Sequence, residues 1–140
     1  MTAASTRPTR VLLAISGTLM KGLELHGTLL AVGATFIREA STAPIYRIWS
    51  IADRYPAMLR VLSGGAAPAV EVWSVPIDGL AQILESEPDG LSIGKVRLAD
   101  GAVVLGVLGE PATCEGQPEI TAFGGWRAYI ASVGRAHPKP

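Results

Sequence analysis

One glutamate at the end of a helical pattern is the residue of this sequence best placed for acid–base chemistry. Residues 76–87 show helical spacing, and Glu87 falls seven positions after the first residue of their apolar face. That face consists of Leu80, Ile83 and Leu84. A glutamate on a buried face loses water, which raises its pKa toward the range of a general base or acid near neutral pH. If the last turn instead frays before Pro88, Glu87 lies in solvent and has no such role.

A glycine-containing turn with a histidine follows the first apolar run, and the sequence there reads SGTLMKGLELH. Successive backbone amides in such a turn can bind a carboxylate, which makes Gly17, Thr18, Leu19 and Met20 candidate substrate-binding residues. His26 is a candidate catalytic residue, although a lone histidine can equally be a hydrogen-bonded structural residue. No Gly-Lys-Ser/Thr follows the turn, so it is not a nucleotide phosphate loop.

Aromatic and arginine side chains occur together in two segments, TAPIYRIW and GGWRAY. Tyr46 and Trp126 could line a pocket and bind substrate, or they could fill the core. Arg47 and Arg127 could each bind a substrate carboxylate in a bidentate manner or pair with an internal acid. The pattern alone leaves both choices open.

The composition is that of a neutral, moderately apolar chain of 140 residues, the size of one domain. Twelve basic residues balance twelve acidic ones, which gives the chain no electrostatic reason to bind nucleic acid or an anionic membrane. Its apolar runs are shorter than the roughly 18 residues of a membrane span. One cysteine and two histidines allow no internal disulfide and argue against a structural zinc site. We therefore expect a cytoplasmic protein without metal or cofactor. The 49% apolar content also favours an interface with a second copy or a partner.

Short strands separated by turn residues dominate the expected structure. Apolar alternation predicts strands at residues 10–16, 32–40, 44–51, 58–62, 69–75, 93–98 and 102–108. Helical spacing predicts helices at residues 76–87 and 123–133. The dipeptide Asp100-Gly101 predicts a hairpin with a two-residue type I′ turn. The expected organisation is one α+β domain at 10–133 with a mixed, barrel-like sheet, between flexible tails at 1–9 and 134–140.

Several of these motifs resemble a known fold. The stretches ISGTLMKG and GATFIREASTAPIYRIWSI resemble the opening of the gamma-glutamylcyclotransferase-like fold. The segments SIGKVRLADG and ITAFGGWRAYIAS resemble the C-terminal domain of allophanate hydrolases and small stand-alone relatives of that domain. The resemblance spans roughly residues 10–133 and implies a small mixed β-barrel flanked by short helices.

The resemblance also implies roles for individual residues. In the cyclotransferases a glutamate after a strand-helix unit is catalytic, and Glu87 falls on that position. The glycine turn of that family binds the substrate carboxylate, which assigns this role to Gly17, Thr18 and Leu19. Stand-alone relatives of the allophanate hydrolase domain often keep a Glu-Pro and a histidine near the turn, matched here by Glu87-Pro88 and His26. The sequence departs from the cyclotransferases at Ser16, where they usually carry an aromatic residue.

Three functions remain open after this comparison. The first is a small-molecule enzyme of urea or allophanate nitrogen metabolism, acting on N-carboxycarbamate or a similar small carboxylated amide. The second is a gamma-glutamyl cyclotransferase that releases 5-oxoproline, with Glu87 as general acid and base. The third is a non-catalytic module that binds an amidase or a second copy of the chain. The Ser-Ser-Lys amidase domain of the allophanate hydrolases is absent from this sequence.

Overall fold

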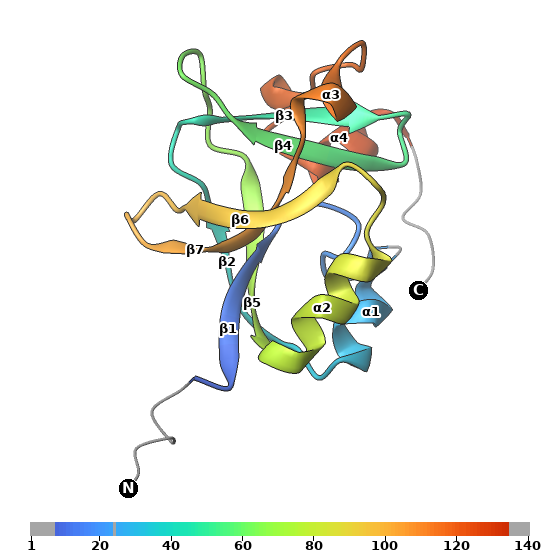
Figure 1. The fold of residues 1–140 in the computed structure, drawn as a ribbon. Helices are drawn as coiled ribbons and strands as arrows, with labels where there is room; N and C mark the ends of the chain where they lie inside the picture. Colours follow the sequence, from blue (N-terminus) through green and yellow to red (C-terminus); the bar gives the residue numbers. More distant parts are fainter. Residues whose placement is uncertain (1–7, 24, 135–140) are drawn as a thin grey trace, which may run out of the picture.

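Two β-sheets, one of five strands and one of two, enclose the core (Figure 1). The computed structural model describes residues 8–23 and 25–134. The larger sheet has the strand order β2-β5-β1-β7-β6, in which β1 and β7 are parallel and the other neighbours are antiparallel. Its strands are β1 (Arg10–Ile15), β2 (Thr35–Ser41), β5 (Ala69–Pro76), β6 (Leu91–Arg97) and β7 (Val103–Gly109). The smaller sheet pairs β3 (Tyr46–Ile51) with β4 (Tyr55–Arg60).

The α+β class and the mixed sheet are confirmed, but the sheet does not close into a barrel. Within the described part of the chain, the two sheets stay separate. The edge beyond β2 approaches the end of β6 through an isolated bridge between Thr42 and Leu98, and Arg38 of β2 forms a salt bridge with Asp100 (3.0 Å). All seven predicted strands are present, each within three residues of its expected ends. The predicted tails fall mostly outside the described residues.

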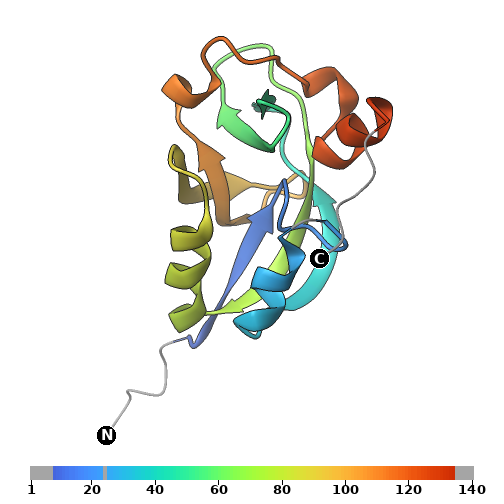
Figure 2. The same ribbon diagram turned by 90° about the vertical axis from the view of Figure 1, so that its right-hand side faces the viewer.

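In the part of the chain that the structure describes, four α-helices and one 3₁₀ helix cover the sheets. They are α1 (His26–Ala31), α2 (Ile77–Ser86), α3 (Pro111–Cys114), η2 (Thr121–Phe123) and α4 (Trp126–Ser132). Helices α1 and α2 contact each other at the lower part of the larger sheet (Figure 1), whereas α4 lies near the smaller sheet (Figure 2). Gly79 permits the close approach of α2 to the end of α1, because a Cβ there would stand 2.8 Å from Cβ of Val32.

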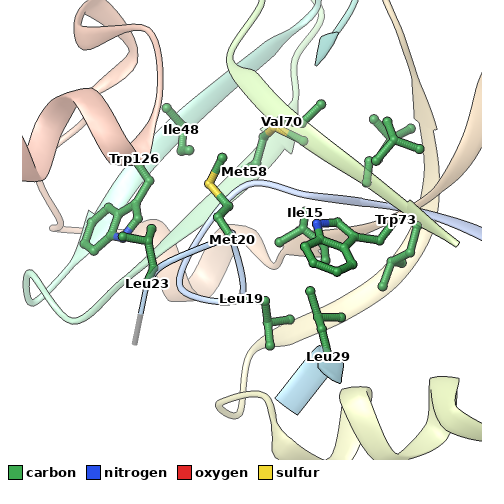
Figure 3. Packing of buried hydrophobic residues seen from close by; sticks show 14 of the residues in the cluster. Ile15, Leu19, Met20, Leu23, Leu29, Ile48, Met58, Val70, Trp73 and Trp126 are labelled. Carbon is green, nitrogen blue, oxygen red and sulfur yellow. The ribbon is translucent and has the colours of Figure 1, made fainter. Parts of the chain in front are cut away.

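The core lies where the two sheets and α1 meet. Figure 3 shows Leu19, Leu29 and Trp73 packed together, with Met20, Met58 and Trp126 farther along the same cluster. Strand β5 lies between β1 and β2, and its residues from Val70 to Val75 are buried except for Ser74. A strand covered on both faces is expected to be apolar throughout, which makes the single acid on β5, Glu71, conspicuous.

The hairpin between β6 and β7 differs from the predicted type I′ turn. Gly101 has a φ of 92°, but Asp100 is not among the residues with positive φ. The amide of Leu98 donates to the carbonyl of Ala102 (2.8 Å), and the amide of Gly101 donates to the carbonyl of Leu98 (3.0 Å). These bonds enclose a three-residue loop in which the glycine alone takes the left-handed conformation. The Asp100 carboxylate accepts from the amide of Ala102 (3.0 Å), which favours this longer loop.

Replacing Gly101 by valine should lower the free energy of unfolding by about 1 kcal/mol or more. A Cβ at Gly101 would meet no atom within 4 Å, so the cost arises from the positive φ alone. Urea denaturation measures this change, and Ala102→Val is the matched control at a position without positive φ. Ligand affinity should stay unchanged in both variants. A weaker affinity at unchanged stability would contradict a purely structural role of this turn.

Candidate functional site

Glu87 lies just beyond α2, at the start of an extended segment. The helix ends at Ser86, and Glu87 has φ −77° and ψ 151°. The following proline imposes this conformation, because its ring clashes with a preceding residue in the helical region. The predicted apolar face is partly wrong: Ile83 is fully buried, but Leu84 is 39% exposed. Glu87 therefore turns inward because of Pro88, and not as a continuation of the helix face.

A small cavity brings Glu87 together with the glycine turn. Its volume is about 20 Å³, enough for one water molecule. The lining residues are Ile15, Ser16, Gly17, Thr18, Leu19, Tyr55, Pro56, Glu87, Leu91 and Val107. Four residues predicted for the site from the sequence, Gly17, Thr18, Leu19 and Glu87, thus line one cavity. Their catalytic and binding roles remain proposals.

The Glu87 carboxyl group is partly shielded from water and has no compensating partner among the described residues. Burial raises its pKa from the ordinary value of 4.5 to about 7. Among the residues that the structure describes, none donates a hydrogen bond to this carboxylate and none forms a salt bridge with it. A carboxyl group of this pKa is present in both protonation states near neutral pH, so it can donate or accept a proton there.

Three successive amides of the glycine turn have no protein partner within the described ranges: those of Gly17, Thr18 and Leu19. All three residues are buried. The amide of Met20 is already used, because it donates to the carbonyl of Gly17 (2.9 Å). The turn thus leaves three donors available to an anion, one fewer than the sequence suggested.

Gly17 allows the turn to pass close to β4. A Cβ at this position would stand 2.6 Å from both Cγ and Cδ of Pro56. Real Cβ contacts are essentially never that short, so any larger residue would displace either the turn or the proline. The glycine therefore permits the close packing of the turn on Pro56, and both residues line the cavity together with Glu87.

The structure places His26 and Tyr46 away from this cavity. His26 begins α1; its Nδ1 accepts from the amide of Gly22 (3.2 Å), and its ring stands edge-on to Trp73 at 5.6 Å. Tyr46 is fully buried, and its hydroxyl accepts from the amide of Arg97 (3.0 Å). Both residues make structural contacts, and neither lines the cavity around Glu87.

Met20 and Trp126 line a different and larger cavity, of about 790 Å³. This cavity lies between α4 and the face of strands β2 and β5. The six residues proposed to bind substrate therefore divide among three places: the Glu87 cavity, this larger cavity and the core.

An ion pair with a buried acid and a half-exposed arginine borders the larger cavity, and sequence reasoning missed the acid. Glu71 is only 3% exposed. Its Oε1 accepts from the amide of Lys21 (2.8 Å) and from Nε1 of Trp73 (3.0 Å), while its Oε2 accepts from Nη2 of Arg127 (3.0 Å). The same Nη2 donates to the carbonyl of Lys21 (2.9 Å). A lone acid in an otherwise apolar central strand was the available signal, since such an acid must be paired.

Both arginines left open by the sequence bind groups within the protein. Arg127 pairs with Glu71, as described above. Arg47 donates through Nε to the carbonyl of Gly64 (3.0 Å), and its Nη1 lies 3.8 Å from Glu119. These contacts favour the structural alternative for each side chain.

Metal ligands do not gather at any point of the described ranges: no three His, Cys, Asp or Glu side chains are suitably grouped in residues 8–23 and 25–134. In the same ranges, no helix has the length and apolar character needed to cross a membrane.

The fold is of the gamma-glutamylcyclotransferase-like class. It is shared with the crystal structure of an aig2-like protein from Mus musculus, with a TM-score of 0.63, 18% identity, and coverage of 81% of this chain and 87% of that chain. At this level of identity the likeness concerns the fold alone.

Within that class, the chain belongs to the allophanate hydrolase C-terminal domain family, whose model matches residues 11–131. A uropathogenic Escherichia coli-specific protein, c4763, is 51% identical, with a TM-score of 0.87 over 93% of this chain and 100% of that one. Allophanate hydrolase of Kluyveromyces lactis is 32% identical, with a TM-score of 0.83 over 94% of this chain and 22% of that one.

Urea amidolyase of Saccharomyces cerevisiae is 31% identical over 129 residues, which cover 87% of this chain. The chain spans about 7% of the length of the curated relatives that it matches. The homologous domain thus also occurs inside a much longer protein.

Proposed function

We propose that this chain is a small-molecule enzyme that acts on N-carboxycarbamate or a similarly small carboxylated amide. The observation that carries the proposal is the Glu87 cavity, where a carboxyl group with a pKa of about 7 and three backbone amides, all without a partner among the described residues, belong to one small lining. Perturbed carboxyl groups and free backbone donors in one cavity are typical of catalytic sites. Membership of the allophanate hydrolase C-terminal domain family supports this substrate class.

The proposed reaction needs a carboxylate-binding group and a proton donor. The amides of Gly17, Thr18 and Leu19 hold one substrate carboxylate. Protonated Glu87 then gives its proton to the substrate nitrogen while the bond from nitrogen to the other carboxyl carbon breaks. The electron pair of that bond stays on nitrogen, carbon dioxide leaves, and carbamate remains. Glu87 recovers its proton from water, and a second protonation converts carbamate to ammonia and carbon dioxide.

The charge of such a substrate would reinforce the acid form of Glu87. A nearby negative charge disfavours ionisation of a carboxyl group, so a bound dianion raises the pKa of Glu87 further. Substrate binding would thereby keep Glu87 protonated until the proton is transferred.

A gamma-glutamyl cyclotransferase is the second candidate, favoured by the fold and by the cavity shared by Glu87 and the glycine turn. Here ionised Glu87 would take a proton from the substrate ammonium group. The freed amine would attack the γ-carbonyl carbon and release 5-oxoproline together with the leaving amine. Like the first candidate, this one needs more room than the cavity of about 20 Å³ offers.

Product analysis separates the two reactions. N-carboxycarbamate would be generated in place from allophanate by a separate amidase, and carbon dioxide and ammonia release would be followed with and without this protein. A rate above the spontaneous breakdown supports the first candidate. Release of 5-oxoproline from gamma-glutamyl-alanine supports the second. If neither reaction is accelerated, the remaining hypothesis is a module that binds an amidase or a second copy.

A further inference from the structure

The Glu87 cavity is too small to hold a whole substrate. At about 20 Å³ it accommodates one water molecule, whereas a carboxylated amide has several non-hydrogen atoms. Part of any substrate must therefore lie outside the cavity, on the surface that adjoins it.

A groove of about 330 Å³ adjoins the cavity, because the two share lining residues. It is lined by Thr18, Leu25, Arg54, Tyr55 and Pro88. Thr18 and Tyr55 belong to both linings, and Pro88 directly follows Glu87. A substrate bound next to Glu87 can extend only a short way before it contacts these residues.

Arg54 is the one lining residue of this groove that carries a full charge near neutral pH. Its side chain is exposed, and it forms no salt bridge or side-chain hydrogen bond with the residues described. Arg38, Arg47 and Arg127 differ from Arg54 in this respect, since all three pair with acids. A guanidinium without a protein partner is available for bidentate binding of a carboxylate.

The turn that carries Arg54 is strained and firmly held. Ala52 and Asp53, which precede it, have φ values of 53° and 57°, although neither is glycine. The Asp53 carboxylate accepts from the hydroxyls of Ser50 (2.6 Å) and Tyr129 (2.7 Å). The amide of Ala52 donates to Oε1 of Gln117 (3.0 Å). Strained backbone persists where its surroundings fix it, and such positions concentrate at functional sites.

We infer that Arg54 binds the outer carboxylate of a short dianionic substrate, while the inner carboxylate lies on the amides of Gly17, Thr18 and Leu19. The inference rests on the proposed function of the Glu87 cavity and names the specificity residue of that site. A dicarboxylate, or an amide nitrogen between two carboxylates, meets a donor group at each end. A substrate with one carboxylate leaves Arg54 unused, so the enzyme would prefer the dianion.

Binding of two simple anions tests this assignment. Malonate is the probe, because its CH₂ replaces the NH of N-carboxycarbamate between two carboxylates, and acetate carries only one carboxylate. Calorimetric titration would compare the wild type with Arg54→Gln, Arg54→Lys and the control Arg97→Gln. Arg97 is exposed on β6, and its replacement changes the net charge equally.

We expect Arg54→Gln to weaken malonate binding by about tenfold or more and to leave acetate binding within twofold of the wild type. The malonate affinity of Arg54→Lys should lie between those of the wild type and Arg54→Gln, since lysine keeps the charge but loses the bidentate geometry. Arg97→Gln should bind both malonate and acetate as tightly as the wild type does. In turnover assays, Arg54→Gln should raise KM for the dianion with little change in kcat, because Glu87 is untouched.

The outcomes distinguish this inference from the proposed function. Equal wild-type affinities for malonate and acetate, or equal losses of both in Arg54→Gln, would overturn the role of Arg54 and leave the Glu87 proposal standing. Malonate binding that depends on Arg54, in a protein without turnover, would support the anion site and overturn the catalytic proposal. If the wild type binds neither anion, both are wrong.

Discussion

Turnover of the true substrate should fall by about 100-fold or more when Glu87 is replaced by glutamine. Glutamine keeps the shape of the side chain but can neither give nor take a proton near neutral pH. The carboxyl group accepts no hydrogen bond from the described residues, so the fold should not suffer from the change. Steady-state kinetics on purified protein measure the effect, and Glu85→Gln is the matched control because Glu85 is exposed two residues away.

The pH dependence of the wild type provides a second readout of Glu87. If the protonated carboxyl group is the catalyst, kcat/KM should fall as the pH rises through about 7. Stability should change in the same direction. The unfolded chain loses this proton near pH 4.5 and the folded protein near 7, so between these values the folded state binds more protons and the free energy of unfolding decreases with rising pH.

Between pH 4.5 and 7, the free energy of unfolding should decrease by at most about 3 kcal/mol, and partial access of water to Glu87 makes the decrease smaller. Glu87→Gln should remove this contribution to the pH dependence of the free energy of unfolding, whereas Glu85→Gln should keep it. An identical pH dependence in wild type and Glu87→Gln would mean that Glu87 is solvated. The enzymatic proposal would then lose its proton donor.

Replacement of Arg127 by methionine should destabilise the protein by about 2 kcal/mol or more. The change leaves the Glu71 carboxylate, 3% exposed, with only the amide of Lys21 and Nε1 of Trp73 as donors. Arg127 itself is 42% exposed at its side chain, so solvent replaces part of the lost interaction and the cost stays below that of a fully buried pair. Urea denaturation gives the free energy.

The double variant Glu71→Gln/Arg127→Met separates loss of the pair from loss of packing. A neutral amide still accepts from Lys21 and Trp73 but needs no cation, so the double variant should be more stable than Arg127→Met alone. If the two variants are equally unstable, the damage comes from lost packing of the arginine side chain. An unchanged stability in Arg127→Met would show that the ion pair contributes nothing.

The strands could be predicted from the sequence because the larger sheet places apolar runs between turn residues. Helix α1 could not. It has only six residues, includes Gly27 and Thr28, and lacks a long apolar face. It forms because Leu29 is fully buried in the core beside Leu19 and Trp73 (Figure 3), which is a tertiary contact and leaves no local pattern.

The candidate site was predicted partly for the wrong reason. Helical spacing pointed Glu87 inward, but the helix ends one residue earlier and the pre-proline conformation turns the side chain into the cavity. His26 lies close to the glycine turn in sequence and yet faces Trp73, because α1 turns the chain there. Glu71 and Arg127 are 56 residues apart, so no local pattern could indicate their pairing.

The central position of β1 constrains the order in which the chain can fold. Its residue Leu13 pairs with Trp73 of β5 on one side and with Leu105 of β7 on the other. During synthesis the first strand emerges long before either neighbour, so the larger sheet cannot be completed until β7 has been made. Such distant pairings slow folding, because a long loop must close before each contact forms. The nascent chain therefore carries an unpaired apolar strand until β5 has been made, and during that time it is most open to aggregation and to binding by chaperones.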